Sequence, residues 1–256
     1  MMLSPMNWRI VVKRSIGIAL SAVLVIAPNA ASAQDNWSGP YFGVFTQAVS
    51  SETDYEDFGC WTACTRPTVQ SNSAGVGATI GYDVQAGDGL VIGLMADIGS
   101  GSKRKLDNSD LGLQTVGAVA WRSDIAFEST ARARIGVNHG KSLIYVTGGL
   151  AFAKATFSAE GRNVTSYYPS HSTNYEAGWS GTLNGRSYGG GLEYAMGKFS
   201  LKAEVLQTKY TPVSSCFGNS DGPNAGVCWS GVSAIPPLLR NAHSATSVKV
   251  GLNFRF

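Results

Sequence analysis

Strict two-residue alternation of apolar and polar side chains is the feature that most limits how this chain can fold. In residues 74–85, apolar side chains at even positions alternate with glycine, threonine, aspartate and glutamine at odd positions. Successive side chains of a β-strand point to opposite faces, so the run predicts a strand with one apolar and one polar face. A Gly87-Asp88-Gly89 turn follows, and residues 90–99 repeat the pattern.

Eight segments in all show this alternation, some of them weakly: residues 41–49, 74–85, 90–99, 127–137, 143–157, 187–194, 199–206 and 247–256. Their links alternate in length: 86–89, 138–141 and 196–197 are short, whereas 50–72, 100–123, 158–185 and 211–241 are long. In an up-and-down sheet, alternate links lie at the same end. We therefore predict an all-β fold, an eight-stranded up-and-down antiparallel transmembrane β-barrel with short periplasmic turns and four long extracellular loops.

The polar face of these strands carries equal numbers of acidic and basic residues. They are Asp83, Asp97, Glu128, Glu193 and Glu204, together with Arg132, Arg134, Lys202, Lys249 and Arg255. In a barrel these side chains face the lumen, where we expect a network of ion pairs. Lys154 and Lys209 share the apolar parity instead, about a dozen residues beyond their tight turns and past the roughly 9–11 residues that cross a membrane. We expect them at the outer rim, where a lysine reaches the headgroups.

A soluble secreted barrel or sandwich would show the same period of two, with its apolar face turned inward. Three features favour the membrane: the asymmetry of the link lengths, the glycine-rich polar face, and the aromatic residues Phe254 and Phe256 at the end of the last strand. Composition agrees, since 14% charged residues and 31 glycines among 256 residues are unusual for a soluble domain.

The N-terminus has the pattern of a cleaved secretory signal. Arg9, Lys13 and Arg14 precede a largely apolar run at residues 16–27, and Ala31-Ser32-Ala33 supplies small residues for cleavage. We predict a signal peptide at residues 1–33 and one outer-membrane β-barrel domain at residues 34–256. The formal charge of +3 comes from those three cations, so the predicted mature chain is neutral and has no basic face for nucleic acid.

Five short motifs carry a family resemblance: residues 36–43 (NWSGPYFG), 145–151 (YVTGGLA), 190–195 (GGLEYA), 201–204 (LKAE) and 248–256 (VKVGLNFRF). Together they resemble the small outer-membrane β-barrel proteins abundant in α-proteobacteria, often described as porin-family or surface-antigen barrels. The resemblance implies a place in the bacterial outer membrane, contact with its lipid and lipopolysaccharide, and biogenesis through the barrel-assembly machinery. In that family the terminal aromatic belongs to the signal that this machinery reads, which here implies Phe254 and Phe256.

Four cysteines lie in the first and fourth predicted loops: Cys60, Cys64, Cys216 and Cys228. Their spacings do not suit zinc, and an exported protein meets an oxidising compartment, so we predict disulfides rather than a metal site. Four cysteines allow three connectivities. We favour the local pairs Cys60–Cys64 and Cys216–Cys228, while a bridge between the two loops stays open.

The sequence offers little catalytic or ligand-binding chemistry. His243 and Ser244 are adjacent strand residues that point to opposite faces, so they do not form a nucleophile–base pair. We predict no enzymatic activity, no metal and no cofactor. Haem binding, known for some members of the resembled family, would have only His171 or His243 on the outer side. Two loop clusters are candidates for a divalent cation and for lipopolysaccharide phosphates, although solvated charge is the simpler interpretation: Glu52, Asp54, Glu56 and Asp57, and Lys103, Arg104 and Lys105.

An eight-stranded barrel is only wide enough for side chains to fill its interior. We therefore predict a closed barrel that serves as a surface protein, with a structural or envelope-integrity role or an interaction role through its extracellular loops. The alternative is a small-solute porin or a haem- or ligand-binding receptor. The sequence leaves the oligomeric state and the ligands of the loops open.

Overall fold

The computed structural model describes residues 36–57, 66–87, 89–107, 118–165, 172–219 and 238–256, and these form ten β-strands. The strands are β1 (Gly39–Asp57), β2 (Thr68–Ala86), β3 (Leu90–Ser100), β4 (Lys103–Asp107), β5 (Ala118–His139), β6 (Ser142–Thr165), β7 (Ser172–Met196), β8 (Phe199–Tyr210), β9 (Val213–Asn219) and β10 (Leu238–Arg255). No helix in the described part of the chain is long and apolar enough to cross a membrane.

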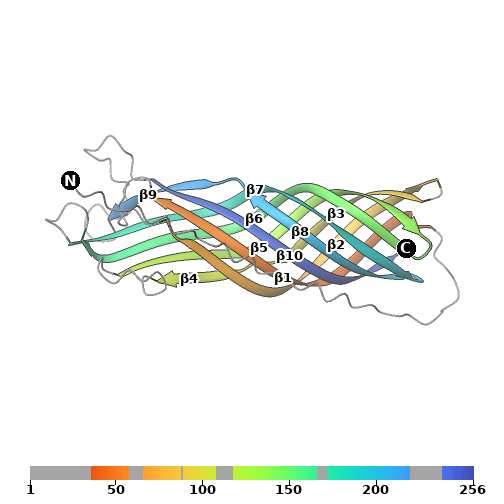
Figure 1. Ribbon diagram of the computed structural model, residues 1–256, viewed down its shortest axis with the longest axis horizontal. Helices are drawn as coiled ribbons and strands as arrows, with labels where there is room; N and C mark the ends of the chain where they lie inside the picture. Colours follow the sequence, from red (N-terminus) through yellow and green to blue (C-terminus); the bar gives the residue numbers. More distant parts are fainter. Residues whose placement is uncertain (1–35, 58–65, 88, 108–117, 166–171, 220–237) are drawn as a thin grey trace, which may run out of the picture. The chain divides into compact units, whose positions relative to one another are not determined.

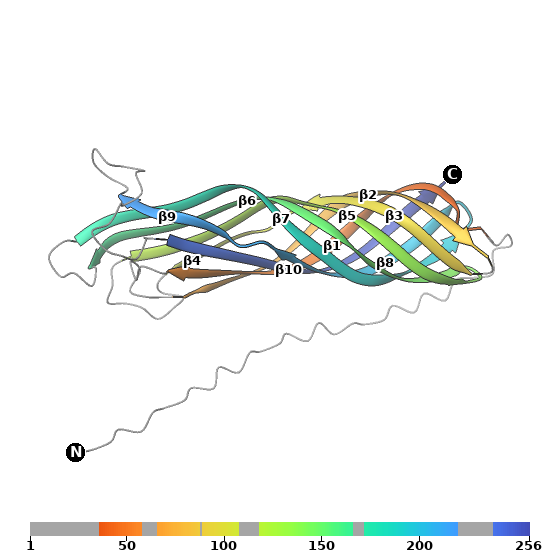
Figure 2. The same ribbon diagram turned by 90° about the horizontal axis from the view of Figure 1, so that it is seen from above.

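The strands close into one antiparallel ring, in the order β1-β2-β3-β5-β6-β7-β8-β10, with β10 pairing back onto β1 (Figures 1 and 2). The two remaining strands are continuations. β4 follows β3 along β5, and β9 follows β8 between β7 and β10. The ring therefore has eight strand positions, and the predicted antiparallel fold is confirmed.

The register around the ring gives the stagger of the wall. Stepping through directly opposite partners from Ile80 on β2, once around the ring and back, leads to Gln70 on the same strand. The shift of ten residues is the shear of the barrel. A closed ring of this size needs such a shear, which tilts its strands by roughly 35–45° from the barrel axis.

Tight turns join the strands at one end of the barrel, which we call the turn end. Gly87, Gly140 and Gly197 lie there with φ of 60°, 58° and 69°. This left-handed conformation suits the short turns whose twist matches that of a β-hairpin, and it favours glycine. The three short links of the sequence are thus confirmed as turns. The opposite end of the barrel is called the loop end below.

Large apolar side chains cover the outside of the wall from the turn end to about its middle. Ile80, Leu94, Ile144 and Val146 are each more than 60% exposed. The exposed large apolar side chains that lie furthest from the turn end are Val76 on β2, Ile98 on β3, Phe127 on β5, Phe152 on β6, Tyr188 on β7 and Val205 on β8. We call this surface the apolar belt. Beyond it the outward residues are polar, as Glu52 on β1 and Gln70 on β2 show.

The strands continue well past the apolar belt, so the predicted loops at 50–72, 100–123, 158–185 and 211–241 were far too long. Past the belt the polarity of the wall reverses: Tyr55 and Val69 point inward and are buried, while Glu52 and Gln70 point outward. The alternation with an apolar outer face therefore ends at the edge of the belt, although the hydrogen-bonded pairing of the strands continues beyond it.

Candidate functional site

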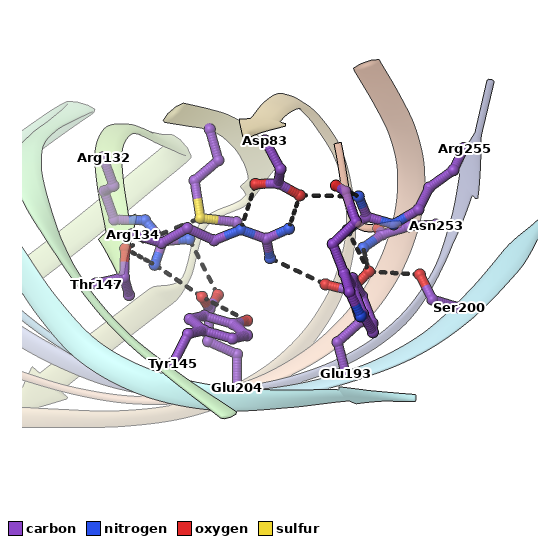
Figure 3. Close-up of polar contacts among 12 residues, drawn as sticks. Asp83, Arg132, Arg134, Tyr145, Thr147, Glu193, Ser200, Glu204, Asn253 and Arg255 are labelled. Atoms are coloured by element: carbon purple, nitrogen blue, oxygen red, sulfur yellow. Dashed lines mark hydrogen bonds and ion pairs between the residues drawn. The ribbon is translucent and has the colours of Figure 1, made fainter. Parts of the chain in front are cut away.

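The lumen near the turn end is filled by four charged side chains from four strands, Asp83, Arg134, Glu193 and Arg255 (Figure 3). We call them the turn-end cluster. Arg134 donates to both carboxylates, with Nε 2.8 Å from Asp83 Oδ1 and Nη1 2.9 Å from Glu193 Oε2. Arg255 does the same, at 2.8 Å from Asp83 and 3.0 Å from Glu193. The cluster is neutral and fully enclosed, with side-chain exposures of 0–3%.

A second group of charges lies further toward the loop end, and we call it the central cluster: Asp97, Arg132, Glu204 and Lys249. Arg132 donates to both oxygens of Glu204, at 2.9 and 3.0 Å, and also to Asp97. Lys249 Nζ lies 3.0 Å from Asp97 Oδ2. Tyr145 donates its hydroxyl to Glu204 at 3.1 Å (Figure 3). A bidentate contact such as that between Arg132 and Glu204 fixes the geometry between strands on opposite sides of the lumen.

Two of the ten predicted lumen charges take part in neither cluster. Lys202 is buried, its Nζ has no hydrogen-bond partner, and it lies 5.8 Å from the centre of the Phe45 ring. Glu128 Oε1 is likewise buried without a partner. Glu128, Asp97 and Lys249 line a cavity of about 10 Å³, which has room for one water molecule.

Aromatic rings complete the packing of the charged lumen, and the sequence reading missed them. The guanidinium of Arg134 lies 4.9 Å from the centre of the Tyr41 ring and 5.0 Å from that of Tyr145. Lys249 lies 4.5 Å from the Phe45 ring. Cations in such positions are attracted by the ring face. These three aromatics occupy the same alternate positions as the polar residues of their strands, and this alternation could have predicted that they point into the lumen.

The lumen toward the loop end has an apolar filling in place of the charges. Phe157 stacks on Trp179 at 5.9 Å and meets Tyr55 edge-on at 6.4 Å. Tyr210 stacks on His243 at 5.5 Å. Around them lie small and aliphatic buried residues, including Val69, Ile125, Ala151, Ala153, Ala155, Leu183 and Leu239. A hollow of about 890 Å³ lies on the outside of the wall, among Val44, Val76 and Val250.

His243 lies toward the loop end, as the haem alternative requires, but its side chain is enclosed inside the barrel. It is 3% exposed, and its Nδ1 lies 2.8 Å from the hydroxyl of Thr53, which also contacts Ser123 at 3.0 Å. Ser244 points to the other face, as the alternation predicted. His243 is seven residues beyond Val250, the outermost exposed large apolar residue of β10, and so lies outside the apolar belt. Burial lowers the pKa of its imidazole to about 4.

The predicted acidic loop cluster belongs to β1, and its members are separately paired along the strand. Glu52 accepts from Gln70 at 2.9 Å and Asp54 from Thr68 at 2.6 Å. Glu56 forms ion pairs with Arg66 and Arg240 at 3.3 and 3.6 Å. The described residues contain no group of His, Cys, Asp and Glu able to hold a metal ion. The side chain of Asp57 is not described.

The basic loop cluster is likewise part of a strand. Lys103, Arg104 and Lys105 begin β4, and Lys103 forms an ion pair with Asp124 at 3.2 Å. His139 is exposed beside a tight turn. The predicted signal peptide and the predicted site residues His171, Cys60, Cys64 and Cys228 lie outside the described residues. Cys216 lies in β9, with its side chain undescribed, so the disulfides stay a prediction.

The two terminal aromatics lie on the outside of the wall at the turn end. Phe254 contacts Phe42, Phe199 and Phe256, with ring centres 5.7, 5.3 and 5.2 Å apart. These rings come from β8, from β1 and from the C-terminal end of the chain at β10, so they lie across the β1–β10 pair that closes the ring. Their role as an assembly signal stays an expectation from the family resemblance.

The sequence matches the family model described as "Outer membrane protein beta-barrel domain" over residues 18–256. The chain therefore belongs to the outer-membrane β-barrel protein family, and its location is the bacterial outer membrane. The apolar belt is the surface that faces lipid, and the turn end faces the periplasm, as in barrels of this class. No curated protein matches the chain at a significant level.

Several solved structures are similar to the chain. Ail, the attachment invasion locus protein of Yersinia pestis, is 12% identical, with 84% of this chain and 99% of that chain covered and a TM-score of 0.36. AlkL, solved in lipid bilayers, is 15% identical, with coverages of 90% and 95% and a TM-score of 0.43. The outer-membrane protease OmpT of Escherichia coli is 11% identical, with coverages of 89% and 99% and a TM-score of 0.44.

Proposed function

We propose that this protein is a closed outer-membrane barrel with a structural and surface-interaction role, rather than a route for solutes. The observation that carries the proposal is the filled lumen. The turn-end and central clusters span the interior where the wall crosses the membrane, and aromatic side chains fill it beyond. An ion crossing such a lumen would have to break several buried, hydrogen-bonded ion pairs at once.

The part of the barrel beyond the belt supports the interaction role. On β6 the strand continues from Phe152 at the belt edge to Thr165, which at roughly 3.3 Å a residue and a tilt of about 40° rises roughly 30 Å. This extension is polar outside and packed with apolar side chains inside. It acts as a rigid support that carries the described strand ends away from the membrane surface.

Single-channel recording in planar bilayers tests the closed lumen. The refolded full-length protein should give no reproducible conductance steps under conditions in which a known porin, as positive control, does. Large and reproducible steps would overturn the proposal and favour the small-solute channel that the sequence left as an alternative. A haem receptor is less well supported, because His243 is enclosed and bonded to Thr53.

We also propose that the barrel is not an enzyme. Within the described part of the chain, the hydroxyls grouped with His243 are those of Thr53 and Ser123, and all three side chains are buried. Mass analysis of lipid A from a strain that overproduces the protein checks this, and a new lipid A species would contradict it.

A further inference from the structure

Three cations project from the outside of the wall on neighbouring strands: Lys154 on β6, Arg186 on β7 and Lys209 on β8. We call them the cation arc. Arg186 lies directly opposite Lys209 in the register of β7 and β8. Lys154 lies opposite Thr182, four residues closer to the loop end of β7 than Arg186. All three side chains are exposed.

The cation arc lacks acidic partners. Within the described residues its members form no ion pair, although other exposed cations of the wall do. The nearest outward acid, Asp124, lies diagonally across the β5–β6 pair from Lys154, but it is already paired with Lys103 at 3.2 Å. Like charges directly opposite each other destabilise a strand pair. An anion from outside the chain would remove this repulsion between Arg186 and Lys209.

The arc lies where the apolar belt ends. Phe152 precedes Lys154 by two residues on β6, and Tyr188 lies two residues closer to the turn end than Arg186; they are 36% and 50% exposed. Leu150, 56% exposed, lies directly opposite Arg186. The charged groups therefore stand at the level of the lipid headgroups, above side chains that face acyl chains. Long cationic side chains at this depth extend to the headgroup region.

We propose that the cation arc binds the phosphate groups of an anionic glycolipid of the outer leaflet, lipopolysaccharide, with the acyl chains against Leu150, Phe152 and Tyr188. A guanidinium binds phosphate through two parallel hydrogen bonds, and an ammonium group adds a point charge. The opposite side of the barrel has no equivalent, since the outward residues at this level of β1 and β2 are Ser50, Glu52, Asn72 and Gln70. The proposed lipid site does not depend on whether the lumen is closed.

The test uses the full-length protein refolded in vesicles of neutral phosphatidylcholine, with and without lipopolysaccharide. The readout is the temperature at which the folded band is lost in gels that separate folded from unfolded barrels. Lipopolysaccharide should raise this temperature for the native protein. The triple variant Lys154→Gln, Arg186→Gln, Lys209→Gln should lose most of the increase. Dephosphorylated lipopolysaccharide and inorganic phosphate should have little effect.

A matched control removes three cations that already have acidic partners, through Arg66→Gln, Lys103→Gln and Arg240→Gln, and it should keep the full increase. The single variant Lys209→Gln keeps the proposal testable if the triple variant fails to fold. It should be as stable as the native protein or more stable in neutral vesicles, because it removes a like-charge contact, and less stabilised by lipopolysaccharide. An undiminished increase in the arc variants, or an equal increase with dephosphorylated lipopolysaccharide or with free phosphate, would overturn the proposal.

Discussion

Glu193 shows how a single side chain couples several strands of the wall. Its carboxylate accepts from Arg134 on β5, from Arg255 and Asn253 on β10, and from Ser200 on β8, while it is itself anchored on β7. Removing one member of a buried ion-pair network leaves the others with uncompensated charge. The charged residues of the lumen therefore differ in importance according to the number of partners each one has, although each carries a single unit of charge.

This difference predicts the effect of neutralising single carboxylates. Glu193→Gln should lower the free energy of unfolding by roughly 3–5 kcal/mol, because Arg134 and Arg255 each lose a charged partner in a buried site. Glu128→Gln should change it by less than about 1 kcal/mol, because Glu128 forms no ion pair with the residues that the structure describes and its Oε1 has no hydrogen-bond partner there. Urea titrations in lipid vesicles measure both, and equal losses for the two variants would contradict the network described here.

His243 makes the stability of the loop-end packing depend on pH. The folded pKa of about 4 is below the ordinary value of 6.5, so between these values the unfolded chain binds a proton that the folded barrel excludes. The stabilisation is complete above about pH 6.5 and declines as the pH falls toward 4. Lowering the pH from about 7 to about 5 should therefore shift the urea midpoint of the native protein downward. His243→Gln should abolish most of this shift, whereas His139→Gln, at an exposed turn, should retain it.

Individual strands pack through glycines that lie opposite large inward aromatics. Tyr41 lies opposite Gly81, and a Cβ at Gly81 would stand 2.3 Å from Cζ of the Tyr41 ring. Gly77 makes room for Phe45 in the same way, four residue pairs further along the same two strands. The glycine-rich polar face is therefore a surface shaped to receive the rings that hold the lumen cations.

Gly81→Ala should displace the Tyr41 ring from Arg134 and destabilise the barrel by roughly 1–3 kcal/mol, the usual cost of overpacking. Gly148→Ala is the matched control. It lies on the outer face, where the nearest atom to an added Cβ is 3.9 Å away, and it should be neutral or slightly stabilising. The unfolding free energies of both variants test this prediction, and a neutral Gly81→Ala would show that the position of the Tyr41 ring does not matter for stability.

The sequence predicts the strands well only where their outer face contacts lipid. Within the belt, alternation predicted the strands, their parity and the inward position of all ten lumen charges, because lipid tolerates only apolar side chains outside. Beyond the belt both sides of the wall admit mixed residues, as Thr53 and Tyr55 inside and Glu52 outside show, and the alternation no longer marks a strand. Which charges pair is set by the stagger of ten residues around the ring, which single strands do not reveal.

At the scale of the whole molecule, the barrel has two parts with opposite polarity. The membrane part is apolar outside and charged inside, whereas the extension is polar outside and holds a cluster of apolar side chains, with some polar ones, inside. The hydrogen-bonded ladders pass through the boundary without interruption on β1, β2 and β10. One continuous wall thus passes from lipid into water, and the residues on both of its faces change at the boundary.

A pair of substitutions on one strand tests where this boundary lies. Ile80 and Asn72 both point outward on β2, eight residues apart, with Ile80 64% exposed within the belt and Asn72 exposed beyond it. Ile80→Arg should cost roughly 2–4 kcal/mol in lipid vesicles, because it places a charge near the middle of the hydrocarbon. Asn72→Arg should change the unfolding free energy by no more than about 0.5 kcal/mol, because its side chain lies in water or among headgroups. Similar costs at the two positions would mean that the membrane does not end between Val76 and Asn72, and the depth assigned to the cation arc would have to be revised with it.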